Sequence, residues 1–412
     1  MAETPWPPVA TEERPWRTNP DLRGPDGARP NRRERELSSI TVTIPVELIE
    51  RTPQLASSTV ALAEDAAQRI TALESRADHL GGLGELLVRT EAVASSKIEH
   101  IHAEMDDIAR ATIGEAAGDK ARRTVAAGLA LTELTDSCGG GAPLTEAAIL
   151  SAHHHLLAND RLEGAWAGRY RQQQNWIGGS DLSPLGAVHI PPPHQLVPGL
   201  MTDMVDFANR NDMSAVAQAA IVHAQFETIH PFTDGNGRVG RGLIGAVLRR
   251  RGLTRGVTVP VAAAMLADVD RYFDQLGAYR SGDVDAIVAY VAGSAIAAAE
   301  ASVESADRLA ELPAHWADAV QARRGSSART LVDGLLKNPI LDIHRASAVT
   351  GSTKIRTYEA LDRLQSTGVL DEITGAGRNR IWVAGDVMTE LRALEERIGR
   401  RSRPSRDRTR LS

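Results

Sequence analysis

The stretch His230–Arg241 constrains this chain more than any other part of it. It places three glycines, one carboxylate, one amide and two arginines between two apolar segments, 215–228 and 243–250. Both segments have the spacing of helices. If the second helix begins near Asn236, its first N–H groups lack partners within the helix and face the intervening loop. Such a helix start, approached closely through glycines, predicts a site for a phosphate.

The polar side chains of this stretch indicate the same chemistry. Arg238 and Arg241 are three residues apart, so both can face one anion from the same side of a helix. Asp234 is a hard oxygen ligand where a phosphate-bound Mg²⁺ needs one. His230, at the end of the preceding helix, is a candidate base near neutral pH. Each residue alone has a structural explanation as a cap, a turn or a solvated face, but together they indicate a nucleotide site.

The whole stretch resembles the signature of the Fic family, HxFx[DE]GNGRxxR, with every fixed position filled. Enzymes of that family typically move AMP from ATP onto a hydroxyl side chain of a target protein. The resemblance therefore implies that ATP is the substrate and that Asp234 holds Mg²⁺. It also implies that His230 is the catalytic base. The residues that it assigns to the nucleotide and its phosphates are Gly235, Asn236, Gly237, Arg238, Gly240, Arg241, Tyr272, Phe273 and Arg280.

Three of those residues come from a later segment. Tyr272 and Phe273 lie in a stretch that resembles the family's YYxxL segment near the adenosine, and Arg280 precedes a Ser-Gly-Asp turn. Phe273 stands where a tyrosine is usual, so stacking is expected there without a hydroxyl contact. Other activities remain open: AMP removal, transfer of another nucleotide or phosphate-linked group, or nucleotide sensing by a DNA-binding regulator.

A helix expected over 83–113 carries a second family feature. Ser95 and Glu99 fill the key positions of the family's inhibitory helix, [ST]xxxE[GN], and His100 replaces the final Gly or Asn. The resemblance implies that Glu99 occupies Arg241 where the γ-phosphate would bind. The alternative is an amphipathic helix with a polar stripe.

Two short segments, 175–177 and 186–190, predict a β-hairpin. In the family the equivalent hairpin is the flap over the active site, which holds the target by strand-like pairing. The flap residues would be Gly186, Ala187, Val188 and His189. A purely structural hairpin is the alternative.

Composition sets broad limits. A chain of 412 residues with 42% apolar residues predicts two or three domains with sizeable cores. Its net charge of −6 argues against binding nucleic acid over the whole surface. One cysteine, Cys138, fits a reducing cytoplasm. No signal peptide is evident, and the apolar run 286–299 is too short to cross a bilayer, so no membrane association is expected.

The C-terminal part predicts three helices and a hairpin over 326–383, an order that resembles a winged helix-turn-helix. DNA and protein are both candidate partners of that domain, besides the target protein, and a homodimer is a candidate assembly. DNA contacts would come from Thr353, Lys354, Arg356, Thr357, Arg378 and Arg380, with help from the arginine-rich tail 397–412.

The expected fold is mainly α: a Fic-type helical bundle with a β-hairpin flap, plus a winged-helix domain. The expected domains are an extended arm (1–37), an N-terminal helical region with the inhibitory helix (38–114), the catalytic core (115–312), the winged-helix domain (325–385) and a C-terminal helix with a basic tail (386–412).

Overall fold

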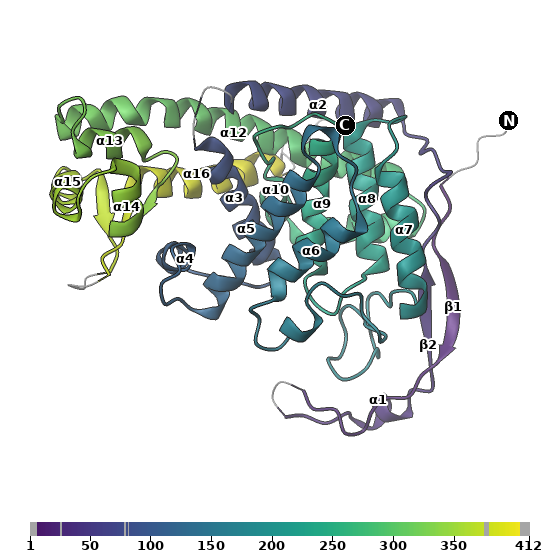
Figure 1. Ribbon diagram of the computed structural model, residues 1–412. Coiled ribbons are helices and arrows are strands. Elements are labelled where there is room, and N and C mark those ends of the chain that lie inside the picture. The colour runs from purple at the N-terminus through teal and green to yellow at the C-terminus, as the bar shows by residue number, and fades with distance from the viewer. Residues whose placement is uncertain (1–5, 25–26, 78–79, 81, 375–378, 404–412) are drawn as a thin grey trace, which may run out of the picture. The chain divides into compact units, whose positions relative to one another are not determined.

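The structure is a computed structural model and describes residues 6–24, 27–77, 80, 82–374 and 379–403. It is mainly α-helical, as the sequence predicts, with a few short strands (Figure 1). The described residues form two compact units. The first contains residues up to Ala63, Glu133–Arg250 and Asp270–Tyr290, and the second contains Glu64–Thr132, Arg251–Val269 and the chain from Val291 onward.

The first unit is built around helix α8. Its helices are α6 (Glu146–Leu157), α7 (Val197–Ala208), α8 (Ala215–Ile229), α9 (Asn236–Arg250) and α11 (Val269–Arg280), with short 3-10 turns at η1 (Gly139–Gly141), η2 (Gly164–Trp166) and η3 (His194–Leu196). Helices α7 and α9 both pack on α8, and α6 packs on α7 and α9. Every residue of α8 after its first is buried, including polar residues such as Gln218 and His223. The residue that ends α8 is therefore held by a packed core.

The N-terminal residues are more ordered than an extended arm. Strand β1 (Ala10–Pro15) pairs antiparallel with β2 (Ser39–Ile44), from Ala10↔Ile44 to Pro15↔Ser39. The connecting segment contains helix α1 (Arg32–Glu36), which begins with a capping box between Asn31 and Glu34. Strand β2 contains three β-branched apolar or hydroxyl residues in a row, Ile40 to Val42, which favour a strand. The partner strand ATEERP has no alternating apolar pattern, so only the pairing itself identifies it.

The second unit includes α3 (Leu83–Ile98), α4 (Met105–Thr112), α10 (Val261–Leu266) and α16 (Gly385–Ser402). Helices α2 (Ser57–Ala77), α5 (Asp119–Ser137) and α12 (Val284–Val320) have residues in both units. Helix α10 packs against α3 and α16, and α16 also packs against α3. The single helix expected over 83–113 is wrong, because the chain leaves the helical conformation after Ile98 and restarts at Met105.

The last part of the second unit combines α13 (Ser327–Gly334), α14 (Ile343–Thr350) and α15 (Lys354–Ser366) with strands β3 (Ile340–Leu341), β4 (Leu370–Glu372) and β5 (Trp382–Ala384). The strands form an antiparallel sheet in the order β3-β5-β4. The three predicted helices and the hairpin strands are present, and β3 adds to them. The tip of the hairpin, including Arg378, lies outside the described residues, and the winged-helix assignment stays a prediction.

Helix α12 extends on both sides of the apolar run 286–299. Within the described residues α12 is the one helix long and apolar enough to cross a membrane, with a mean hydropathy of 1.6 in its most apolar window. That window is 61% buried, as in the core helix of a folded domain.

Helix α16 extends into the segment expected to be a free basic tail. Arg397 is buried there and donates to Ser305 Oγ at 2.6 Å and to Glu390.

Candidate active site

The turn at His230 joins α8 to the loop before α9. His230 has φ 50° and ψ 61°, the left-handed conformation, and its N–H donates to the Phe226 carbonyl at 2.8 Å. A residue with a Cβ incurs roughly 1–2 kcal/mol in this conformation. The surrounding structure must offset that cost, and it does so through hydrogen bonds to the carbonyl of His230. It accepts from Arg171 Nε at 2.9 Å and from Asn175 Nδ2 at 3.3 Å.

The imidazole of His230 is largely enclosed, with 17% of its side chain exposed. Its Nδ1 lies 3.9 Å from Glu227 Oε2, one helical turn earlier. Burial lowers the pKa of His230 to about 3, and the nearby cations Arg171 and Arg280 act in the same direction. The ring is therefore neutral near pH 7 and able to accept a proton, as a base must be.

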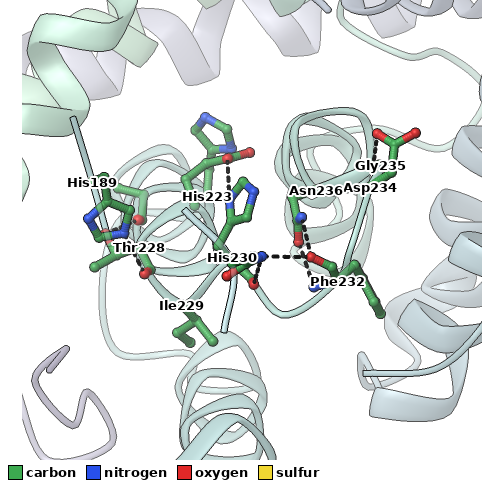
Figure 2. Close-up of polar contacts among 12 residues, drawn as sticks. His189, His223, Thr228, Ile229, His230, Phe232, Asp234, Gly235 and Asn236 are labelled. Carbon is green, nitrogen blue, oxygen red and sulfur yellow. Dashed lines mark hydrogen bonds and ion pairs between the residues drawn. The ribbon is translucent and has the colours of Figure 1, made fainter. Parts of the chain in front are cut away.

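The loop that follows is closed by its own side chains. Asn236 accepts from the Phe232 N–H at 2.8 Å and donates back to the Phe232 carbonyl at 2.9 Å, as Figure 2 shows. Gly235 has φ 82°, and a Cβ there would lie 2.8 Å from Leu156 Cδ2. Glycine is therefore required at this position for both its backbone conformation and its lack of a side chain.

His153 supports the loop from α6. Its Nδ1 accepts from the Gly168 N–H at 3.0 Å, so the neutral ring carries its proton on Nε2, which lies 3.0 Å from the Asp234 carbonyl. The ring stacks on Phe232 with centroids 3.7 Å apart. Burial lowers the pKa of His153 to about 4, which keeps this tautomer neutral. The sequence did not indicate this supporting contact.

Asp234 and the two arginines lie at the start of α9. Asp234 Oδ1 accepts from the Gly235 N–H at 2.6 Å and from Arg238 Nη2 at 3.2 Å. The Asp234 side chain is 36% exposed, whereas Arg238 and Arg241 are buried. Among the described residues no group of three His, Cys, Asp or Glu side chains could hold a metal alone. A single exposed carboxylate fits Mg²⁺ that is also bound by substrate phosphates.

Gly240, a predicted phosphate contact, has a packing role in the structure. It lies inside α9, where a Cβ would come 2.4 Å from Glu227 Oε1 and 3.0 Å from Phe226 Cδ1. The absence of a side chain thus lets α9 approach α8. Gly237 lies in the first turn of α9, as predicted, and Asn236 begins that helix.

Phe273 and Arg280, on α11, line a cavity of about 750 Å³ together with flap residues Gly186 to His189 and strand β2. Phe273 is 48% exposed, and burial lowers the pKa of Arg280, which stays a cation at neutral pH. Tyr272 instead is buried, with its hydroxyl 3.1 Å from His223 Nε2. The structure thus brings two of the three α11 candidates to the flap and makes Tyr272 part of the core.

The flap is not a regular hairpin. Its only ladder contact in the described chain is the bridge Ile177↔His189, where the Ile177 N–H donates to the His189 carbonyl at 2.8 Å. Left-handed glycines at 178, 179 and 186 bend the backbone out of the strand conformation. His189 is buried and reaches the Thr228 carbonyl at 2.9 Å (Figure 2), while Val188 is 80% exposed. The flap thus presents one apolar side chain outward.

Ser95 and Glu99 belong to the second unit. Ser95 is buried in α3, whereas Glu99 is the exposed residue that caps the end of that helix. His100 follows with φ 59°; its N–H donates to the Lys97 carbonyl at 3.0 Å, and the Ile101 N–H donates to the Ser96 carbonyl at 2.9 Å. This is a Schellman ending, in which Gly or Asn is favoured. The family preference at this position thus has a backbone explanation, while the Glu99–Arg241 pair stays a prediction.

The candidate DNA contacts have different environments. Lys354 and Arg356 are exposed at the start of α15, but Thr357 is buried. Arg380 forms ion pairs with Glu372 at 2.9 Å and Asp362 at 3.0 Å and covers the ring of Trp382. Arg380, the candidate hairpin arginine among the described residues, is therefore already bound to side chains of the same chain.

Comparisons with known proteins agree with this geometry. Residues 143–248 match the family model described as Fic/DOC family, and residues 58–128 match the one described as Fic/DOC family N-terminal. A probable protein adenylyltransferase of Aquifex aeolicus is 45% identical over 75 residues, 18% of this chain and 23% of that protein. Protein adenylyltransferase Fic of Nematostella vectensis is 32% identical over 148 residues, 35% of this chain and 30% of that protein.

The matched regions thus span less than a third of these curated relatives. A crystal structure of a Fic family protein from Desulfovibrio desulfuricans G20 has a TM-score of 0.53 at 19% identity, with 80% of this chain and 97% of that one covered. That likeness concerns the fold. The filled signature, the loop geometry and both matching family models lead to one conclusion: this chain carries a Fic/DOC family domain at residues 143–248, preceded by the Fic/DOC N-terminal region.

Proposed function

We propose that this chain is a protein adenylyltransferase, which moves AMP from ATP to a Tyr, Thr or Ser hydroxyl of a target protein. The observation that carries the proposal is the neutral, largely enclosed His230 imidazole, placed at the turn before a glycine loop and a helix start. Relatives named as adenylyltransferases support the same activity.

In the proposed reaction the hydroxyl oxygen of the target attacks the α-phosphorus of ATP while His230 takes the hydroxyl proton. A P–O bond forms, the bond from the α-phosphorus to its bridging oxygen breaks, and pyrophosphate leaves. The low pKa of His230, about 3, keeps the ring unprotonated before reaction. The anionic triphosphate would raise that pKa toward the working pH, which strengthens the base when substrate is bound.

The start of α9 supplies groups for the phosphates. The first N–H groups of a helix lack acceptors within the helix, so those of Asn236 and Gly237 are suited to the α-phosphate. The Gly235 N–H donates to Asp234 instead, so Gly235 shapes the loop. Arg238 and Arg241 would bind the β- and γ-phosphates. Asp234 would hold Mg²⁺, which when bound neutralises charge on the leaving pyrophosphate.

The direct test uses ATP labelled at the α-phosphate. We expect label on protein with the wild type, and a loss of about 10²–10⁴-fold in His230→Ala, the usual effect of removing a general base. His154→Ala, which changes an exposed histidine, is the matched control. Binding of a non-hydrolysable ATP analogue should persist in His230→Ala. Undiminished labelling by His230→Ala would refute the role of His230, and release of AMP from labelled protein would favour AMP removal.

We further propose that Glu99 inhibits this activity, because it is exposed at the end of α3 and matches the family's inhibitory position. A second function, DNA binding, is favoured by the exposed Lys354 and Arg356 at the start of α15. Duplex binding through phosphates should weaken steeply with salt. A gel-shift assay without binding at low salt would leave protein docking as the role of this region.

A further inference from the structure

Arg171 is a buried arginine that precedes the flap and contacts the turn at His230. It is 2% exposed. Its Nε donates to the His230 carbonyl at 2.9 Å, and its Nη2 reaches the carbonyls of Pro192 at 2.6 Å and Ile229 at 3.4 Å. Its backbone N–H donates to the Pro231 carbonyl at 2.9 Å. One residue therefore contacts three consecutive carbonyls at the end of α8.

The same side chain also joins both ends of the flap segment to this turn. Its Nη1 donates to the Gln173 carbonyl at 3.1 Å, before the flap, while Pro192 follows the flap. The neighbouring Gln174 side chain donates to the Pro191 carbonyl at 2.8 Å, and the Asn175 side chain bonds to the Phe232 carbonyl at 3.0 Å. The guanidinium thus lies at the point where the two ends of the flap segment meet the turn at His230.

The charge of Arg171 is unusual for a buried group. No carboxylate among the described residues forms an ion pair with it, and every acceptor named above is a neutral carbonyl. Burial lowers the pKa of Arg171 to about 10, so it remains a cation at neutral pH. The carbonyl end of α8 is the negative end of the helix dipole, which stabilises a cation there. The site therefore holds a positive charge beneath the turn that carries His230.

We propose that Arg171 is a positioning residue with two separable effects: its forked donors hold the His230 turn and the flap ends together, and its positive charge adds to burial in favouring the neutral form of the His230 imidazole. The other charged groups facing His230 are Arg280, Glu227 and Asp234, and none is hydrogen-bonded to the His230 carbonyl. The proposal deepens the proposed function, because a neutral, correctly turned His230 is what proton abstraction from a hydroxyl requires.

Two substitutions separate these effects. Arg171→Lys keeps a positive charge but loses the planar fork, whereas Arg171→Met removes both at similar volume. Arg210→Met is the matched control, because Arg210 also holds backbone carbonyls in the first unit, those of Ile49 and Arg51. Protonation of His230 is followed by NMR of the ¹⁵N-labelled imidazole as pH falls. Label incorporation from ATP is measured in parallel.

Neighbouring unit charges typically shift a pKa by about one unit or more, so Arg171→Met should raise the pKa of His230 by about that amount. Arg171→Lys and Arg210→Met should leave it near the wild-type value. Both Arg171 variants should lose turnover by about tenfold or more, with a smaller change in KM for ATP, because the turn is misplaced.

An unchanged His230 titration in folded Arg171→Met would overturn the electrostatic effect, and full turnover in Arg171→Lys would overturn the positioning effect. The NMR titration needs no activity. If even the wild type incorporates no label, the proposed function fails, while the titration still decides whether Arg171 acts on His230.

Discussion

Acidification should unfold the first unit at a pH where its carboxylates are still ionised. Burial disfavours the charged ring, so His189, His223 and His230 have a pKa of about 3 and His153 has a pKa of about 4. In the unfolded chain the same rings titrate near about 6.5. Between these values the unfolded state binds protons that the folded state does not. Stability is therefore complete above about pH 6.5, falls as pH drops below it, and stops falling near about pH 3.

The size of the loss follows from the shifts. At about pH 5.5, one unit below the unfolded value, each neutral imidazole costs roughly 1.4 kcal/mol, and the four together cost about 6 kcal/mol. A typical domain is stable by only about 5–15 kcal/mol, so this is a large fraction of the total. Carboxylates, with pKa values near about 4, contribute little in that window.

Urea unfolding followed by tryptophan fluorescence, at several values between about pH 7.5 and about pH 5.5, measures the slope. His223→Gln should reduce the slope by about one quarter, since one of four buried rings is removed. His154→Gln, at an exposed position, should leave it unchanged. A free energy of unfolding that is flat over this range would refute the idea that the four rings are neutral because they are buried.

Three further predictions concern single positions. Gly240→Ala should destabilise the protein by about 1–3 kcal/mol, the usual cost of overpacking, because its Cβ would come 2.4 Å from Glu227 Oε1 and 3.0 Å from Phe226 Cδ1. Gly199→Ala, with no atom within 4 Å, should be neutral or stabilising in chemical unfolding. Glu99→Gly should raise label incorporation from ATP above wild type if Glu99 is the inhibitor; equal labelling by the two folded proteins would show otherwise. His100→Gly should raise the free energy of unfolding by about 1 kcal/mol, because it relieves a left-handed backbone; an unchanged urea midpoint would contradict this.

The family relationship and most helices were predictable because their signals are local. Helical apolar spacing marks the segments 215–228 and 243–250, which lie within α8 and α9. The nucleotide loop was recognisable because its special residues are adjacent in sequence and each has a distinct chemical role.

The predictions that differ from the structure concern segments whose conformation or partners a local sequence pattern does not show. The flap has the predicted antiparallel pairing only at Ile177 and His189, because left-handed glycines at 178, 179 and 186 interrupt the strands. The helix over 83–113 breaks at His100, where a histidine adopts the conformation that glycine signals more clearly. Arg380 and Arg397 resembled free basic residues, but each has acidic partners that the sequence does not place beside it.

The sequence by itself determined the motif, its order and the helices on either side of it. The tertiary structure alone decided which side chains support that motif. Arg171 lies 59 residues before His230, and His153 lies 81 residues before Asp234. No local pattern marks either residue, because a buried cation or a neutral imidazole is defined by the carbonyls that the folded chain brings around it.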